Sequence, residues 1–375
     1  MFAAVAAVIP LAIWLYLLAG RGWFWRLRES APPLLERTNL AVVAVIPARD
    51  EAAVIGQAVS SLLSQAYAGP LHIIVVDDHS SDGMAEIVRG IFSEDGVTIV
   101  TADPLPPGWT GKLWAIACGL RPALARKPDY LLFTDADIVH ARNAVEGLVA
   151  RAEANGLDLA SLMVKLRCET LAERALVPAF LYFFLKLYPP AWIADLESRT
   201  AGAAGGCILL RPSALKRMGG IESIRTELID DCALAREVKK GGPIWMGITS
   251  TSHSIRAYDT FGEIGGMIAR TAFTQLRHST LLLAGTVVGL FLTYVAPPML
   301  AIAGPGRVAH ILGAVAWLMM IVTYWPTLRL YRRAPWWALA LPLVAVFYAA
   351  ATVQSAVAYW TGKGGVWKGR VQDQP

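Results

Sequence analysis

Carboxylates recur in this chain directly after short apolar runs. A carboxylate at such a place often closes a turn or caps a helix. Three apolar runs that all end in acids are harder to explain by capping alone, and they indicate a site for a cation or a polar ligand. The acids concerned are Asp50 and Glu51, Asp77 and Asp78, and Asp135 and Asp137, and a later pair, Asp230 and Asp231, adjoins a helical stretch.

The segment Asp135-Ala136-Asp137 has the spacing of a metal site. In an extended segment, residues i and i+2 share a face, so both carboxylates are expected to approach one hard cation. Mg²⁺ and Mn²⁺ are commonly held by one or two carboxylates together with substrate phosphate oxygens. The D-x-D pattern is frequent by chance, and its place after the apolar run at 130–133 is what favours a metal. We therefore predict Mg²⁺ or Mn²⁺ at Asp135 and Asp137.

The elements that must position these acids alternate along the chain. Short, apolar, β-rich runs predict buried strands, and periodic stretches between them predict helices. This alternation predicts an α/β fold with a mostly parallel sheet and helices on both faces, whose ligands bind at the carboxyl ends of the strands. The predicted strands are 40–46, 71–76, 97–100 and 130–133, and the predicted helices are 51–65, 84–92, 111–125 and 141–155.

The composition requires that part of the chain contacts lipid. Apolar residues make up 55% of the sequence and charged residues 17%, whereas soluble domains carry about 25% charge. This balance excludes a fully soluble enzyme, a disordered protein and a disulfide scaffold. The four cysteines form no C-x-x-C pair, which favours a reducing compartment for the polar part.

Four apolar stretches are long enough to span a membrane: 2–20, 280–303, 308–324 and 335–360. The first is followed by Arg21, Arg26 and Arg28, which predicts an uncleaved anchor whose following segment is cytoplasmic. The predicted organisation is an anchor at 1–22, a cytoplasmic catalytic domain at 38–260, an interfacial connector at 261–279, membrane segments at 280–361 and a basic tail at 362–375. The expected location is therefore the inner cell membrane, with several passes.

The basic residues near the C-terminus conflict with four complete crossings. No Asp or Glu lies between residues 264 and 372, while nine Lys and Arg do, which is typical of membrane-flanking segments and not of a nucleic-acid surface. A fourth crossing would place Lys363, Lys368 and Arg370 outside, against the positive-inside rule. Either the last segment is re-entrant or one of the four spans is wrong.

The stretch 175–194 is also apolar, but a single crossing there would separate Asp137 from Asp231. Lys186 and the pair Pro189-Pro190 further disfavour a span. We expect an interfacial helix beside an acceptor entrance, with a buried core helix as the alternative.

Residues 40–260 resemble the family 2 glycosyltransferases with a GT-A fold. The resemblance is carried by VIPARDE, IIVVDDHSSD, GWTGK at 108–112, TDAD and the Asp230-Asp231 pair. One N-terminal span, GWTGKLWA and the terminal WKGR at 367–370 are closest to the hopene-associated membrane glycosyltransferases. The motif Gln275-Leu276-Arg277-His278 is one residue short of the family's Q-x-x-R-W motif and lacks its Trp, which argues against a polymer-extruding synthase.

The resemblance implies roles for individual residues. Ala48, Asp50 and Glu51 would line a nucleoside pocket, and Asp77 or Asp78 would accept a hydrogen bond from the uracil or the ribose. Lys112 would approach the diphosphate, and Asp135 and Asp137 would hold the metal. Asp231 is the expected base, although Asp230 stands where the family usually has Glu, so the division of roles within the pair stays open.

The expected function is a membrane-bound hexosyltransferase that moves one sugar from a UDP-linked donor to a lipid, with inversion. A hopanoid-type lipid is the expected acceptor, and a polyprenyl phosphate is the alternative. A transporter or scaffold with a nucleotide-sensing domain is a more remote alternative, since its spans would need polar residues. No nucleic-acid partner is expected, and nothing in the sequence indicates an oligomeric state.

Overall fold

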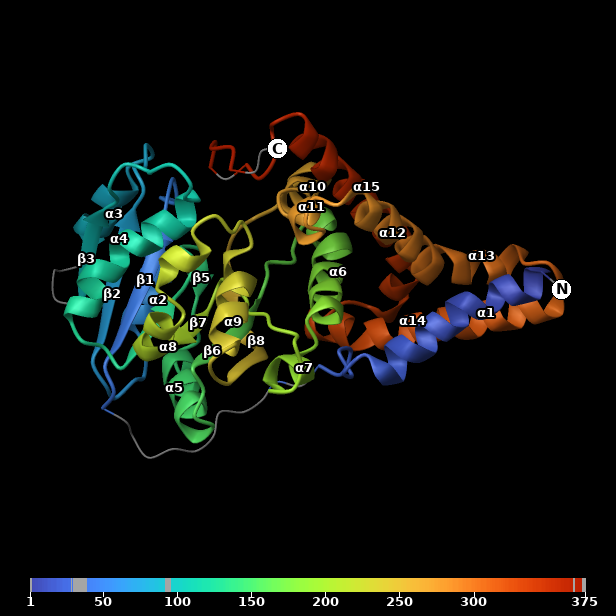
Figure 1. Ribbon diagram of the computed structural model, residues 1–375, viewed down its shortest axis with the longest axis horizontal. Coiled ribbons are helices and arrows are strands. Elements are labelled where there is room, and N and C mark those ends of the chain that lie inside the picture. Colours follow the sequence, from blue (N-terminus) through green and yellow to red (C-terminus); the bar gives the residue numbers. More distant parts are fainter. Residues whose placement is uncertain (1, 28, 30–38, 92–95, 367, 373–375) are drawn as a thin grey trace.

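The computed structural model describes residues 2–27, 29, 39–91, 96–366 and 368–372 of the 375-residue chain. Arg28, Trp367 and the first predicted domain residue, Thr38, lie outside these ranges. The described chain forms a sheet domain and a group of long apolar helices that extends away from it, with the N-terminus at the far end (Figure 1). The C-terminal segment lies back beside the sheet domain.

One eight-stranded mixed sheet forms the centre of the sheet domain, in the order β3-β2-β1-β4-β7-β6-β8-β5. Neighbours β3, β2, β1 and β4 are parallel, whereas β7 is antiparallel to both β4 and β6. β6 pairs parallel with β8, and β8 pairs antiparallel with β5. The strands are β1 (Val42–Ala48), β2 (Leu71–Asp77), β3 (Val97–Thr101), β4 (Tyr130–Phe133), β5 (Ile138–Val139), β6 (Leu159–Lys165), β7 (Ile208–Leu210) and β8 (Ile244–Ser254).

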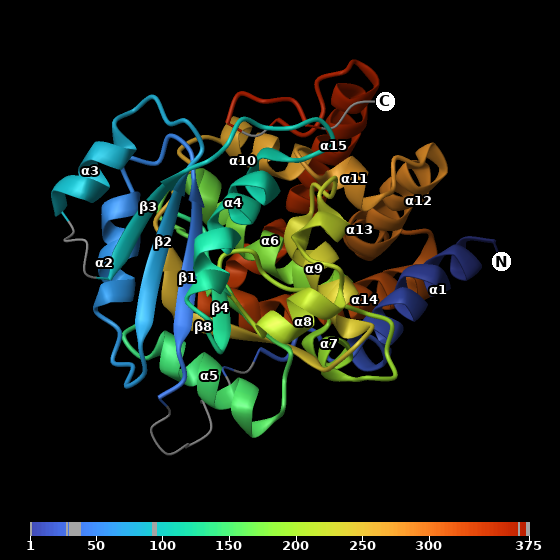
Figure 2. The same ribbon diagram turned by 60° about the vertical axis from the view of Figure 1, so that its left-hand side comes forward.

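Helices cover both faces of this sheet because successive strand residues point to opposite sides. Val42, Ala44 and Ile46 pack on one face, which is covered by α2 (Ile55–Leu63), α3 (Met84–Ile91) and α5 (Ala144–Ala154). Val43 and Val45 face the other side, which is covered by α4 (Gly111–Ala125), α8 (Pro212–Arg217), the short helix η2 (Ile221–Ile224) and α9 (Asp230–Lys239). Figure 2 shows α4 and α9 on one side of the strands, with α2 and α3 further across. The predicted α/β architecture with a mostly parallel sheet is confirmed.

The four predicted strands and four predicted helices all exist, with shifted ends. The strand 130–133 and the helix 111–125 have the predicted bounds. Helix α2 begins only at Ile55, because Asp50 has a φ of +51° and the following residues form turns. The prediction missed β5, β6, β7 and β8, of which β5 and β7 have only two and three residues.

Four described helical stretches are long and apolar enough to cross a membrane by length and composition: Leu171–Ala194, Thr280–Ala303, Gly306–Leu330 and Pro335–Trp360. A shorter apolar helix, Ala7–Gly20, corresponds to the predicted anchor. The elements are α1 (Phe2–Leu15) with η1 (Tyr16–Gly20), α12 (Thr280–Leu290) with η3 (Phe291–Val295) and α13 (Ala296–Ala303), α14 (Gly306–Leu330), and η4 (Pro335–Ala340) with α15 (Leu341–Trp360). α1, α13 and α14 run side by side (Figures 1 and 2), and Trp14 Nε1 donates to the carbonyl of Thr293 at 2.7 Å.

Helix α6 (Leu171–Leu187), with the short α7 (Pro190–Ala194), joins the sheet domain to these helices. Tyr182, 1% exposed, has its hydroxyl 2.8 Å from that of Thr323 on α14, and Tyr348 on α15 donates to the carbonyl of Leu176. Ten of the seventeen α6 residues are buried. The packing of α6 therefore favours the buried core helix over the interfacial helix that we expected.

Helix α15 begins beside the end of α14 and ends beside α11 (Ala272–Gln275), which follows α10 (Phe261–Ala269). The amide of Phe273 on α11 donates to Ser355 Oγ at 3.0 Å, and the rings of Tyr359 and Trp360 lie 5.6 and 5.5 Å from that of Phe273. α12 starts close to α11, and the turn that joins α13 to α14 lies at the far end (Figure 1). Both ends of α15 therefore lie at the sheet-domain end of the apolar helices, which supports the re-entrant alternative.

Candidate functional site

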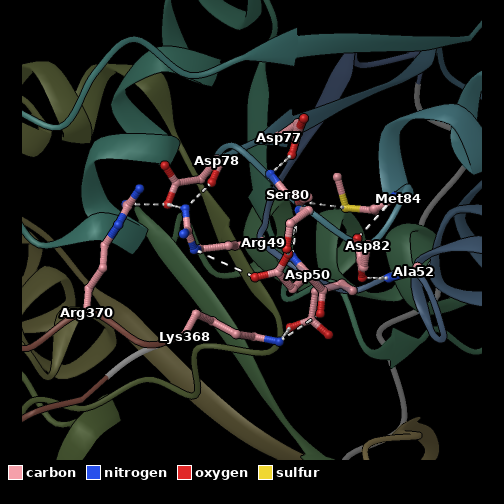
Figure 3. A network of polar contacts seen from close by, with 12 residues as sticks. Arg49, Asp50, Ala52, Asp77, Asp78, Ser80, Asp82, Met84, Lys368 and Arg370 are labelled. Carbon is pink, nitrogen blue, oxygen red and sulfur yellow. Dashed lines mark hydrogen bonds and ion pairs between the residues drawn. The ribbon is translucent and has the colours of Figure 1, made fainter.

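The loops after β1 and β2 are joined through their acids, as Figure 3 shows. Asp50 Oδ1 accepts hydrogen bonds from the amide of Ser81 at 2.7 Å and from its hydroxyl at 3.1 Å. Asp77 Oδ1 accepts from the amide of Ser80, and Asp82 Oδ2 accepts from the amide of Ala52. Hydrogen bonding to Ser81 holds the pKa of Asp50 below its usual value, despite some burial. These carboxylates shape the two loops, so they are less free for a ligand than the sequence suggested.

Two further acids at these strand ends are buried and bound to cations. Glu51 is 8% exposed, and its Oε1 lies 2.6 Å from Arg256 Nη2. The carbonyl of the buried Ala48 accepts from the amide of Asp78, which places Asp78 beside the end of β1. Burial raises the pKa of Asp78, while Arg370 and Arg49 counteract the effect.

Lys112 forms the centre of a second group, where the first turn of α4 meets the end of β4. Its Nζ lies 2.9 Å from Asp135 Oδ1 and 3.1 Å from Asp230 Oδ2, so one ammonium bridges two segments 95 residues apart. Although burial opposes it, the carboxylates of Asp135, Asp230 and Asp231 raise the pKa of Lys112 far above its usual value. Lys112 is therefore cationic at neutral pH, which suits contact with an anionic diphosphate.

The prediction that Asp135 and Asp137 share a strand face is wrong. β4 ends at Phe133, and Asp135 to Asp137 form the turn that leads into β5. The two side chains bind different partners: Asp135 contacts Lys112, while Asp137 Oδ2 accepts from Ser254 Oγ at 2.6 Å and lies 3.3 Å from Arg256 Nε. Burial opposes ionisation of Asp135, but the Lys112 ammonium holds the pKa of this carboxyl below its usual value. Burial raises the pKa of Asp137 despite the nearby Arg256.

The acidic pair begins helix α9, and its two members have different surroundings. Asp230 contacts Lys112, whereas Asp231 Oδ2 accepts from the amide of Gly205 at 2.9 Å and its Oδ1 accepts from the amide of Cys232 at 2.7 Å. Burial, together with the neighbouring Asp230, raises the pKa of Asp231 to about 6. A carboxyl with this pKa exchanges protons near neutral pH, as a general base requires.

A pocket lies among these groups. It combines the Lys112–Asp135 pair with the start of α9 and an apolar wall. The turn at Gly205 and Gly206, which leads into β7, forms one side, and a Cβ at Gly205 would lie 3.2 Å from Lys112 Nζ and 3.4 Å from Asp231 Oδ2. The lining residues are Pro47, Lys112, Leu113, Ile116, Phe133, Thr134, Asp135, Gly205, Ile208, Ile221, Ile224, Asp230, Asp231 and Leu234.

The structure thus arranges the predicted residues in two groups. Lys112, Asp135, Asp230 and Asp231 meet at the pocket, and Ala48, Asp50, Glu51, Asp77 and Asp78 meet at the ends of β1 and β2. Asp137 does not line the pocket: Arg256, which follows β8, joins it to Glu51 of the strand-end group. Arg256 and Ser254 were not predicted as site residues because β8 was not predicted. The charges of Lys368 and Arg370 predict a membrane-flanking segment, whereas the structure places both on the strand-end acids.

The carboxylates fit a divalent cation that shares its coordination with a ligand. Among the described residues, no cluster of three or more His, Cys, Asp or Glu could hold a metal by itself. In the contacts described above, Asp135 uses its Oδ1 and Asp137 its Oδ2, so each carboxylate has a second oxygen that could face a cation. One or two carboxylates plus phosphate oxygens is a usual Mg²⁺ arrangement.

Part of this chain is similar in sequence to known glycosyltransferases. Residues 43–219 match the model of glycosyl transferase family 2. The chain is 27% identical over 154 residues to a 4,4'-diaponeurosporenoate glycosyltransferase from Staphylococcus aureus, which covers 40% of this chain and 39% of that relative. It therefore spans about two fifths of the length of the curated relatives it matches.

The fold of nearly the whole chain has a counterpart among solved structures. The mannosyltransferase PcManGT from Pyrobaculum calidifontis, solved in complex with GDP-Man and Mn²⁺, superposes with a TM-score of 0.58 and 17% identity. The match covers 94% of this chain and 98% of that one. The predicted GT-A-type fold with additional apolar helices is thereby confirmed.

Proposed function

We propose that this chain, which carries a glycosyl transferase family 2 domain, transfers one sugar from a nucleotide-sugar donor to a lipid at a membrane surface. The observation that carries the proposal is the pocket in which Asp231, with its raised pKa, lies beside the Lys112–Asp135 pair. A base and a fixed cation in one pocket suit a reaction in which a hydroxyl loses a proton and a diphosphate leaves.

The donor is expected to lie along the carboxyl ends of the strands. The acids after β1 and β2 would face the nucleoside, and Lys112 would face the diphosphate. Asp135 and Asp137 would hold a divalent cation, which supplies Lewis-acid stabilisation of the leaving diphosphate when bound. The PcManGT complex with GDP-Man and Mn²⁺ supports a nucleotide sugar and a divalent cation in general. A UDP-linked donor remains our proposal from the family resemblance.

The transfer itself needs one base from the chain. Asp231 would take the proton of the acceptor hydroxyl as its oxygen attacks the anomeric carbon, and the bond to the diphosphate would break on the opposite face. With one base and no second nucleophilic carboxylate assigned, a single displacement with inversion is the simplest course. Lys112 would keep Asp230 paired, which leaves Asp231 as the carboxyl of the pair that can accept a proton.

A lipid acceptor is supported by the continuity of the sheet domain with the apolar helices. One hydrophobic cluster contains Val43 and Val45 of the sheet, Leu176 of α6 and Tyr324 of α14. The relative named for 4,4'-diaponeurosporenoate is consistent with an apolar acceptor. We propose a hydroxyl-bearing, hopanoid-type lipid, with the sheet domain on the cytoplasmic face of the inner membrane.

A polyprenyl phosphate is the second candidate. Its acceptor oxygen is already anionic and needs no strong base, so the raised pKa of Asp231 favours the hydroxyl lipid. A transporter or scaffold that only senses nucleotides would need neither Asp231 nor the pocket.

The test compares lipids from cells that produce the wild-type chain with lipids from cells that produce Asp231→Asn at equal levels. Mass spectrometry should find a lipid heavier by one hexose only with the wild-type chain. Purified full-length protein should then make the same product from UDP-hexose and the unmodified lipid. Identical lipidomes, together with no cleavage of any nucleotide sugar by the purified chain, would refute the proposal.

A further inference from the structure

Two cations from the far end of the chain lie on the acids at the ends of β1 and β2. Arg370 Nη1 lies 2.6 Å from Asp78 Oδ2, and Lys368 Nζ lies 2.8 Å from Glu51 Oε1 and 3.0 Å from the carbonyl of Asp50. Figure 3 shows both side chains reaching the same loops from one side, with Arg49 between Asp78 and Asp50. The contacts join residues 292 and 317 positions apart, for Arg370–Asp78 and Lys368–Glu51 respectively.

Asp78 is more than an ion-pair partner. Its side chain is 1% exposed, and Oδ1 is buried without a hydrogen-bond partner among the described residues. A buried acceptor with no donor costs free energy, so this oxygen is poised for an N–H or O–H from outside the chain. Arg370 occupies Oδ2, which leaves Oδ1 as the acceptor of this carboxylate that has no partner among the described residues.

The local charge explains why the site needs these cations. Five carboxylates meet at these loops and are contacted by two cations of the sheet domain, Arg49 and Arg256. The excess of negative charge would repel an anionic nucleoside diphosphate. Lys368 and Arg370 reduce that excess at the two most buried acids. The five carboxylates are those of Asp50, Asp77, Asp78 and Asp82, which Figure 3 labels, and that of Glu51, which contacts Lys368.

The origin of the tail is anchored by packing. Just before it, Tyr359 stacks on His278 with ring centroids 4.1 Å apart and contacts Phe273. Because these contacts hold the end of α15 against α11, the segment that follows is tethered close to the sheet domain, which lowers the entropic cost of reaching the acids.

We infer that the segment 368–372 belongs to the donor-binding site. In this site Arg370 positions Asp78 to bind the nucleobase, and Lys368 neutralises the charge of Glu51. The inference rests on the proposed function and extends it. The strand ends supply the acceptors, and the tail supplies the charge that lets an anionic nucleotide approach them. Arg370 acts through Asp78 and is a positioning residue.

The experiment titrates UDP and, separately, GDP into the purified full chain in detergent, with isothermal calorimetry as the readout. Arg370→Ala and Lys368→Ala should each weaken binding of the preferred nucleotide about tenfold or more, since each removes a charge-assisted contact to a buried acid. Arg370→Lys should recover part of the loss because it restores the charge. Lys363→Ala is the matched control, because it removes the same charge from an exposed position in the same tail.

A double-mutant cycle with Asp78→Asn separates positioning from general destabilisation. If Arg370 acts through Asp78, Arg370→Ala should cost much less affinity in the Asp78→Asn background than in the wild type. In turnover assays, the tail variants should raise the donor KM and leave kcat nearly unchanged. Unfolding temperatures are measured for every variant, and Arg370→Gln, which keeps the side-chain length, replaces Arg370→Ala if the latter unfolds.

The outcomes separate the two proposals. If the wild type binds a nucleotide and the tail variants bind it equally well, the tail inference is wrong. Tighter binding by the tail variants would also overturn it, since the tail would then compete with the donor. A wild-type chain that binds neither UDP nor GDP would refute the proposed function, and the inference with it.

Discussion

The amide of Gly205 donates a hydrogen bond of 2.9 Å to Oδ2 of Asp231, so the turn before β7 fixes the position of the proposed base. The backbone can come this close because Gly205 has no side chain. Its position between Lys112 Nζ and Asp231 makes it sensitive to a single added methyl group.

Gly205→Ala should therefore lower kcat while the protein stays folded. The new Cβ would lie 3.2 Å from Lys112 Nζ, so the ammonium must shift by a few tenths of an ångström. Small displacements of catalytic groups can cost up to about 10²-fold in rate. Gly90→Ala on α3, where a Cβ meets nothing within 4 Å, is the matched control and should keep wild-type turnover.

Asp231→Asn keeps the size and polarity of the side chain but removes its basicity. Loss of a general base typically costs ~10²–10⁴ in rate, so kcat should fall by that order with donor KM little changed. Asp230→Asn, which disturbs the contact with Lys112, should be milder in kcat. The reverse order in steady-state assays would exchange the two roles, and no effect of either would favour a phosphate-bearing acceptor.

The pH profile should report the same carboxyl. Burial and Asp230 raise the pKa of Asp231 to about 6, and the base works only when deprotonated. The acceptor kcat/KM should therefore rise with pH up to about 6 and then level off.

The stability of the fold should change with pH in the opposite direction. The folded state binds the proton of Asp231 more tightly than the unfolded chain does, so this group lowers the free energy of unfolding as pH rises from about 4 to 6. Chemical denaturation of wild type and Asp231→Asn across this range checks the second statement.

A divalent cation should affect the binding of the nucleotide donor and not that of the acceptor. Asp137→Ala should abolish the Mn²⁺-dependent part of nucleotide binding, and EDTA should do the same to the wild type, as measured by calorimetry. Ser254→Ala is the control, since it removes the hydrogen bond to Asp137 but leaves both carboxylates in place. Activity of the wild type that EDTA does not change would exclude the metal assignment.

Membrane topology can be tested with single cysteines in a background without the four native ones. Because Arg370 contacts Asp78, the tail and the sheet domain must lie on the same side of the membrane. Cysteines at the exposed positions Glu222 and Lys363 should both resist a membrane-impermeant maleimide in intact cells. A cysteine at the exposed Arg307, in the distant turn before α14, should be labelled if α12–α13 and α14 cross. Labelling at Lys363 but not at Glu222 would contradict the contact.

The sequence predicted the parts of the fold whose signals are local. The run at Tyr130–Phe133 is buried in full, and α4 spans Gly111–Ala125 as its periodicity indicated. Strand β7 has three residues, which are too few to show an alternating pattern. Its antiparallel position between β4 and β6 depends on tertiary packing and not on the local sequence. The sequence also predicted that the acids lie close together, because the carboxyl ends of parallel strands meet at one edge of the sheet.

The pairing of those acids could not be read from spacing. Asp135 and Asp137 look like neighbours on a strand, but a turn directs them to Lys112 and Arg256, which come from distant segments. The same holds for Lys368 and Arg370, whose charges are also typical of a membrane-flanking segment. Their contacts with Glu51 and Asp78 depend on the position of α15, which brings the end of the chain back to the sheet domain.

The contact between the tail and the strand ends also orders events during synthesis. The sheet domain is synthesised before α12, whereas residues 368–372 are synthesised only after α15. If the donor site needs Arg370 on Asp78, a newly made sheet domain cannot bind its nucleotide until every apolar helix has been inserted and packed. Chains whose insertion stalls would then stay inactive, and sugar would be consumed only where the completed protein meets its membrane.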